Sequence, residues 1–203
     1  MKKYTVADYA FQFITVTGGV LIALLIDGLT ETKNNRELVA AAHATIVREV
    51  ADNLKELEGL PKGLEASNAE IESCLRFAND VLSKGKSDVR SLSLNFNLPS
   101  LDSSGWQTAD RTGALAHMSY EEVRRYSELY SRQSLFDAQS RKIIDLVSAA
   151  TALMAGSFDH DKASKADMAR FRDQLMLLQA SVVVTGQLGD QLLEAYRKFQ
   201  PNK

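Results

Sequence analysis

Cysteine, proline and excess charge are all scarce in this chain, and each scarcity excludes a class of protein. The 203 residues include one cysteine, Cys74, so no disulfide can close within the chain. A net charge of −2 gives no electrostatic reason to expect a nucleic-acid partner. The three prolines, at positions 61, 99 and 201, fall outside the periodic segments. Because strong helix formers dominate the remainder, the composition predicts a mostly helical protein.

The usual sequence signatures of an active site are absent as well. The three histidines stand at positions 43, 117 and 160, and no two of them have the four-residue spacing of a helical zinc site. The run Asp159-His160-Asp161 lacks the glycine and the glutamate that a calcium loop requires after it. No nucleophile elbow, phosphate-binding loop or dinucleotide-binding glycine pattern occurs. We therefore expect no catalytic residue, no metal site and no bound cofactor.

One long apolar run stands out, from Tyr9 to Ile26. It contains about 18 residues without a charge, and as a helix it would cover roughly 27 Å, close to the hydrocarbon thickness of a bilayer. We predict that residues 1–30 form a retained membrane anchor, with the lipid bilayer as its surroundings. Two alternatives stay open. One is a cleaved secretory signal, although no A-x-A-like site follows the run; the other is a buried helix of a soluble protein, which the Gly18-Gly19 pair favours.

Three small residues, Thr15, Gly19 and Ala23, recur at four-residue spacing and share one face of the predicted anchor. Such a face lets a second membrane helix approach closely, so we expect association with other membrane subunits or with a second copy. The alternative is that these small residues are incidental on a lipid-facing helix. Basic residues are nearly balanced across the run, and Lys2 and Lys3 favour a cytoplasmic N-terminus with a periplasmic bundle. The predicted location is the bacterial inner membrane.

Apolar residues recur at three- and four-residue steps through the remainder of the chain and predict an all-α fold. The helix after the anchor is expected to end at Gly59-Leu60-Pro61 and to be either continuous with the anchor or kinked near Gly28. Further helices are expected over about 64–83, 118–154 and 164–199, and Gly186 and Gly189 favour a bend or a break in the last. Residues 31–203 are therefore predicted to form an antiparallel up-and-down helical bundle, with an irregular insertion at about 86–118.

Local signals refine this picture. Residues 91–96 alternate polar and apolar side chains, the period of a strand, but no second strand is there to pair with them. We interpret them as an extended segment that covers the bundle, with a short hairpin as the alternative. The pairs Ser119–Glu122 and Ser164–Asp167 have the spacing of helix N-caps.

The irregular insertion is also where a bundle is expected to leave room for a pocket. The candidate lining residues are Trp106, Thr108, Asp110, Arg111 and Tyr120. The alternative is that the insertion only plugs one end of the bundle.

Three segments carry a resemblance: the apolar run ending at Asp27, the stretch Arg48-Glu49-Val50-Ala51-Asp52-Asn53-Leu54, and the block from Gly105 to Leu115. In them the chain resembles uncharacterised bacterial single-pass membrane-anchored helical proteins that contain a domain of unknown function. The resemblance implies no activity and supplies no catalytic residues. We expect a non-enzymatic protein that acts in protein–protein interaction, as an accessory subunit of a membrane complex. Two other functions stay open: a small-molecule-binding sensory bundle outside the cytoplasm, and a membrane-tethered enzyme.

Overall fold

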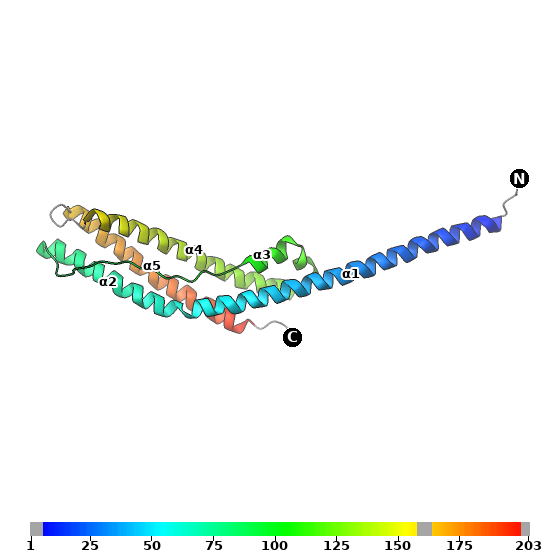
Figure 1. The fold of residues 1–203 in the computed structure, drawn as a ribbon, viewed down its shortest axis with the longest axis horizontal. Helices are drawn as coiled ribbons and strands as arrows, with labels where there is room; N and C mark the ends of the chain where they lie inside the picture. The colour runs from blue at the N-terminus through cyan, green and yellow to red at the C-terminus, as the bar shows by residue number, and fades with distance from the viewer. Residues whose placement is uncertain (1–5, 158–163, 200–203) are drawn as a thin grey trace.

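The computed structural model describes residues 6–157 and 164–199, and these residues are helical apart from a long connection at residues 85–103 and short turns (Figure 1). The elements in chain order are α1 (Val6–Glu58), α2 (Leu60–Lys84), α3 (Ser104–Arg111), the 3₁₀ helix η1 (Ala114–His117), α4 (Tyr120–Ser157) and α5 (Lys165–Lys198). No strand occurs among these residues. The predictions of an all-α fold and of a long apolar N-terminal helix are confirmed.

Helix α1 is unbroken over 53 residues, without a kink at Gly28, so it is about 80 Å long at 1.5 Å per residue. Its N-terminal half projects away from the other helices (Figure 1). The large apolar side chains there, from Phe11 to Leu29, are 54% to 74% exposed. By length and composition, this is the one helix of the described chain that could cross a membrane, and none of its apolar stretch is buried.

Helix α1 ends at Glu58, where its end was predicted, but the chain does not reverse at this junction as an up-and-down bundle requires. Gly59 keeps right-handed helical backbone angles, with φ −78° and ψ −16°, and Gly63 N–H donates to the Gly59 carbonyl at 3.2 Å across the junction. Pro61 lies in the first turn of α2, where its missing N–H leaves no helical bond unmade. As a result, α2 continues in the direction of α1 instead of folding back along it (Figure 1).

Helix α5 is the centre of the folded domain. It packs along α4 and α2 and also contacts α1. Hydrogen bonds join Gln133 to Tyr196 and Gln139 to Ser181, so residue numbers rise along α4 as they fall along α5. Glycine allows close packing at one point on α5, because a Cβ at Gly189 would lie 2.2 Å from Leu60 Cδ2 and the Leu60 side chain would have to shift. No break occurs at the two glycines, since α5 is helical from Lys165 to Lys198.

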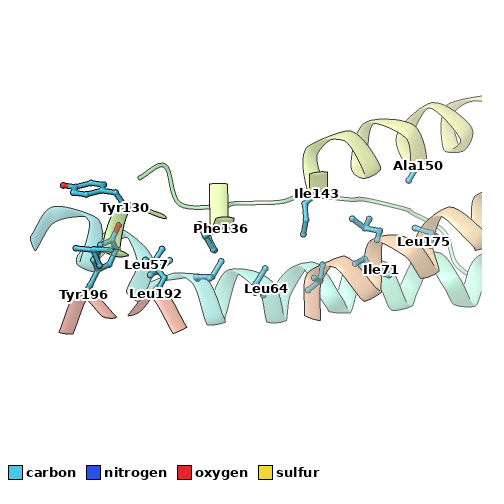
Figure 2. Packing of buried hydrophobic residues seen from close by; sticks show 14 of the residues in the cluster. Leu57, Leu64, Ile71, Tyr130, Phe136, Ile143, Ala150, Leu175, Leu192 and Tyr196 are labelled. Carbon is cyan, nitrogen blue, oxygen red and sulfur yellow. The ribbon is translucent and has the colours of Figure 1, made fainter. Parts of the chain in front are cut away.

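The core follows the whole length of these helices (Figure 2). Tyr130 and Tyr196 lie at one end of it, and Ala150 and Leu175 lie at the other. Helices α2, α4 and α5 together contribute fully buried apolar side chains at helical spacing, among them Ile71, Phe136, Ile143, Phe171, Leu178 and Leu192. Burying one such side chain contributes about 1.5–3 kcal/mol, so this seam is what holds the domain together.

The extended segment after α2 runs back along that helix (Figure 1). Ser67 Oγ donates to the Asn95 carbonyl at 3.0 Å, and the Asn95 N–H donates to Glu70 Oε2 at 2.6 Å. Its alternate side chains are half-buried against the core, namely Leu92, Leu94, Phe96 and Leu98. The period-two pattern therefore marks an extended cover, as predicted, and the hairpin alternative does not form.

Both predicted helix caps are present. Ser119 Oγ accepts the Glu122 N–H at 3.3 Å, and Glu122 Oε2 accepts the Ser119 N–H at 3.3 Å, which is a reciprocal capping box. Ser164 Oγ accepts the Asp167 N–H at 3.0 Å at the start of α5.

Candidate functional site

Buried polar side chains gather where α1, α4, α5 and the loop before α3 meet. The five members, here called the Glu49 cluster, are Glu49, Asn53, Tyr130, Gln133 and Tyr196, and none is more than 7% exposed. A buried polar group without a partner costs about 1–3 kcal/mol. The cluster is stable only because its members satisfy one another and the adjoining backbone.

Glu49 binds the start of α3. Tyr130 OH donates to Glu49 Oε1, and the Gly105 N–H donates to Glu49 Oε2 at 2.6 Å. The carboxylate thus lies at the N-terminus of a helix, where free N–H groups favour negative charge. Glycine suits position 105, because a Cβ there would lie 3.0 Å from Thr45 Cγ2 and 3.1 Å from Glu49 Oε2.

Asn53 and Gln133 hold the loop that leads into α3. Asn53 Nδ2 donates to the Asp102 carbonyl at 2.7 Å, and the Asp102 N–H donates back to Asn53 Oδ1 at 2.8 Å. Gln133 Nε2 donates to the same carbonyl at 3.0 Å, while Gln133 Oε1 accepts from Tyr196 OH at 2.6 Å. A single backbone carbonyl therefore joins α1 to α4, and through Gln133 to α5.

Tyr130 and Tyr196 act as hydrogen-bond donors. Burial raises the pKa of Tyr130 above its usual range, and its hydrogen bond to the Glu49 carboxylate raises it further. Burial likewise raises the pKa of Tyr196, although the Asn53 hydrogen bond opposes the shift, and burial raises the pKa of Tyr126 to about 12. The phenols keep their protons at neutral pH and are therefore unsuited to act as bases.

A polar cleft of about 330 Å³ lies directly outside the Glu49 cluster. It is here called the Trp106 cleft, and its wall includes Trp106, Gln107, Ser127, Ser131, Ser134, Asp137 and Arg141. The Trp106 ring stacks on Tyr130, with centroids 5.3 Å apart and planes 12° apart.

Of the five predicted pocket residues, Trp106 is half-buried and lines this cleft. Thr108, Asp110 and Arg111 are exposed on α3, and Tyr120 is 78% exposed at the start of α4. None of these four is among the residues that line the Trp106 cleft.

A second groove, of about 670 Å³, lies where α1 leaves the bundle. Its polar lining includes Arg36, His43, His117 and Glu122. His43 Nε2 lies 3.8 Å from Glu122 Oε1. No group of three His, Cys, Asp or Glu side chains that could hold a metal ion occurs among the residues described. The run 159–161 lies outside those residues.

The small residues of the predicted anchor lie on the projecting part of α1. Thr15, Gly19 and Ala23 are all exposed, and a Cβ added at Gly19 would meet nothing within 4 Å. The Thr15 hydroxyl donates to the Phe11 carbonyl at 2.8 Å, so it needs no partner from water. At 3.6 residues per turn, these three residues lie on roughly the opposite side of α1 from the buried Ile46.

The sequence did not single out Glu49, Asn53 or Asp137. For Glu49 and Asn53 the sequence does contain a pattern that could have identified them. They are polar residues within the apolar series on the buried face of α1, which consists of Ile46, Val50 and Leu57. A polar residue at a core-facing position predicts a buried partner. The partners, however, come from α3, α4, α5 and the loop before α3, far along the chain.

No known protein family, curated protein or solved structure matches the chain. The resemblance to bacterial membrane-anchored proteins therefore stays a prediction, and the function of the site is argued from its own residues.

Proposed function

We propose that this chain is a non-enzymatic, single-pass membrane protein whose antiparallel helical bundle acts in protein–protein interaction, as an accessory subunit of a membrane complex. The observation that carries the proposal is the exposed apolar half of α1. Eleven large apolar side chains there are exposed: Phe11, Phe13, Ile14, Val16, Val20, Leu21, Ile22, Leu24, Leu25, Ile26 and Leu29.

The free energy involved is too large for water to be the natural surroundings of this segment. Full burial of one large apolar side chain is worth about 1.5–3 kcal/mol, so leaving eleven of them more than half exposed forfeits on the order of 10–20 kcal/mol. That is comparable with the whole stability of a typical domain, about 5–15 kcal/mol. A bilayer removes this cost, and the helical backbone already satisfies its own hydrogen bonds, as lipid requires.

The continuity of α1 supports a rigid stalk between the membrane and the bundle. The helix runs without a break from the apolar stretch through Asp27 to Leu38, which packs against the core of the folded domain. These 11 steps along the helix span roughly 16 Å. We place the N-terminus in the cytoplasm and the bundle in the periplasm of a bacterial inner membrane, because Lys2 and Lys3 precede the span.

The face formed by Thr15, Gly19 and Ala23 is the proposed contact for another membrane subunit or a second copy. Small residues at four-residue spacing let two helix backbones approach closely. Because this face points away from the side of α1 that packs in the bundle, a partner helix can reach it without meeting the bundle.

Cysteine cross-linking in membranes tests this contact. Cys74 is buried, so a cysteine introduced on the anchor would be the main reactive thiol. We expect Gly19→Cys to form a disulfide-linked dimer, or an adduct with a partner that carries a thiol-reactive cross-linker. The control Leu21→Cys, on the opposite side of the helix, should form neither. Equal cross-linking at both positions, or none at Gly19→Cys, would contradict the proposed face.

A small-molecule-binding function has one observation in its favour, the Trp106 cleft. It is compatible with the membrane anchor, because the residues that line the cleft all belong to the folded domain.

A further inference from the structure

We propose that the Trp106 cleft binds a neutral saccharide ring, held on the Trp106 indole and by the polar side chains of α4. This goes beyond the proposed interaction role and does not depend on it, because every residue involved belongs to the folded domain. The cleft volume of about 330 Å³ is at the lower end of the range for small-ligand sites.

The aromatic wall of the cleft is rigid before any ligand arrives. Trp106 stacks on Tyr130 and also contacts Tyr126, with centroids 6.2 Å apart. Tyr130 is itself fixed by its hydrogen bond to the buried Glu49. A side chain held in this way loses little conformational freedom on binding, which favours affinity. The Trp106 indole N–H donates to no other group in the described part of the chain, so it is available to a ligand.

The polar wall presents groups that can both donate and accept hydrogen bonds. Ser127, Ser131 and Ser134 lie on the cleft side of α4, and within residues 6–157 and 164–199 their hydroxyls have no partner. By contrast, Ser148, further along the same helix, returns its hydroxyl to the Ile144 carbonyl at 2.8 Å. A row of free hydroxyls matches a ligand that is itself rich in hydroxyls, because each hydroxyl is both donor and acceptor.

One carboxylate and one guanidinium complete the wall and balance each other. Asp137 and Arg141 lie one helical turn apart, and both line the cleft. Burial raises the pKa of Asp137, while Arg141 opposes the shift. A half-buried carboxylate without a hydrogen-bond donor gains most from a ligand that supplies one.

This balance selects among ligand classes. A ligand with a single negative charge would meet Asp137 unfavourably, and one with a single positive charge would meet Arg141 unfavourably. A purely apolar ligand would bury the serine hydroxyls without partners. A free amino acid would match the charged pair but would leave the indole face and the serines unused. A polyhydroxylated ring uses all of these groups.

The single tryptophan makes the proposal directly measurable. Trp106 is the only tryptophan in the chain, so intrinsic fluorescence reports on the cleft alone. The full chain would be purified in a detergent without a sugar head group and titrated with N,N′-diacetylchitobiose and with maltose. We expect a saturable fluorescence change with at least one of them, with a dissociation constant at or below about 1 mM. Isothermal titration calorimetry provides a second readout.

Variants separate a built site from a non-specific effect. Asp137→Asn keeps the shape of the side chain but removes the charge, and we expect binding to weaken by about tenfold or more, since hydrogen bonds to charged groups are the strong ones. Ser131→Ala should weaken binding by a smaller factor. The control Asp145→Asn changes an exposed α4 carboxylate outside the cleft and should bind like the wild type. Circular dichroism confirms that each variant is folded.

Three results would overturn the proposal. The first is the absence of saturable binding of either disaccharide to the folded protein with a dissociation constant at or below about 1 mM. The second is equal affinity in Asp137→Asn, Ser131→Ala and the wild type. The third is a fluorescence change produced by glycine and not by a saccharide, which would assign the cleft to amino acids.

Discussion

Removing the Glu49 carboxylate is expected to destabilise the domain far more than removing an exposed glutamate from the same helix. In Glu49→Ala, Tyr130 OH and the Gly105 N–H both lose their acceptor. Both groups are buried, and each unsatisfied group costs about 1–3 kcal/mol. The free energy of unfolding should therefore fall by about 2–5 kcal/mol. For a domain of this size that corresponds to a lower melting temperature by about 6–15 °C.

The assay is thermal or urea unfolding in mild detergent, followed by circular dichroism. Glu56→Ala, at an exposed position two turns further along α1, is the matched control and should change the melting temperature by less than about 2 °C. Glu49→Gln should lie between the two, because its amide oxygen can accept from Gly105 while its NH₂ donates to the Tyr130 oxygen. If Glu49→Ala and Glu56→Ala unfold at the same temperature, the carboxylate does not hold α3 in place and the reasoning fails.

Three further predictions concern packing, pH and capping. Gly189→Ala should lower the free energy of unfolding by about 1–3 kcal/mol through overpacking, because its Cβ would lie 2.2 Å from Leu60 Cδ2. Gly186→Ala, whose Cβ would lie an ordinary 3.5 Å from Leu64 Cδ1, should be neutral or stabilising, and equal urea midpoints for the two variants would count against this packing. Burial raises the pKa of the Cys74 thiol from 9.0 to about 11, so the folded state keeps this proton longer than the unfolded state. The stability that this raised pKa contributes is fully present below about pH 9 and is lost as the pH rises towards 11. In urea titrations, Cys74→Ala should therefore lose less unfolding free energy over this alkaline range than the wild type. Ser164→Ala removes the acceptor of the Asp167 N–H and should cost about 1 kcal/mol, measurable as a lower melting temperature.

Local sequence patterns predicted the elements well because their causes are local. The capping pairs at Ser119 and Ser164, the extended segment with Leu92 and Leu94, and the uncharged N-terminal run each depend on residues within a few positions of one another. Periodicity and capping chemistry act over such distances, so the sequence alone is enough to read them.

The direction of the chain at Gly59 could not be read in the same way. A Gly-x-Pro sequence permits either a reversal or the first turn of a new helix. The choice depends on what α2 packs against, and α2 packs along α5, whose residues come more than a hundred positions later. Packing between α2 and α5 therefore determines the direction of the chain after Gly59, which the Gly-x-Pro sequence alone leaves open.

The cleft was only partly predictable for the same reason. The sequence pointed to the irregular insertion and to Trp106, but it placed the remaining lining residues on α3 and at Tyr120. In the structure the opposite wall comes from α4, through Ser131, Asp137 and Arg141. Which face of α4 meets α3 is fixed by the Asn53 and Gln133 bonds to the Asp102 carbonyl, and that register has no local sequence signature.

The central claim is that lipid surrounds the projecting half of α1, and partitioning of the full chain between membrane and water tests it most directly. Cells would be lysed without detergent, and the membranes would be pelleted and washed with alkaline carbonate. We expect the wild type to stay in the pellet until detergent is added. We expect the double variant Ile22→Asp, Leu25→Lys, which places two charges in the span at about 2.5–3.5 kcal/mol each, to be released in a folded form. Wild-type protein in the supernatant would show that lipid does not surround this segment.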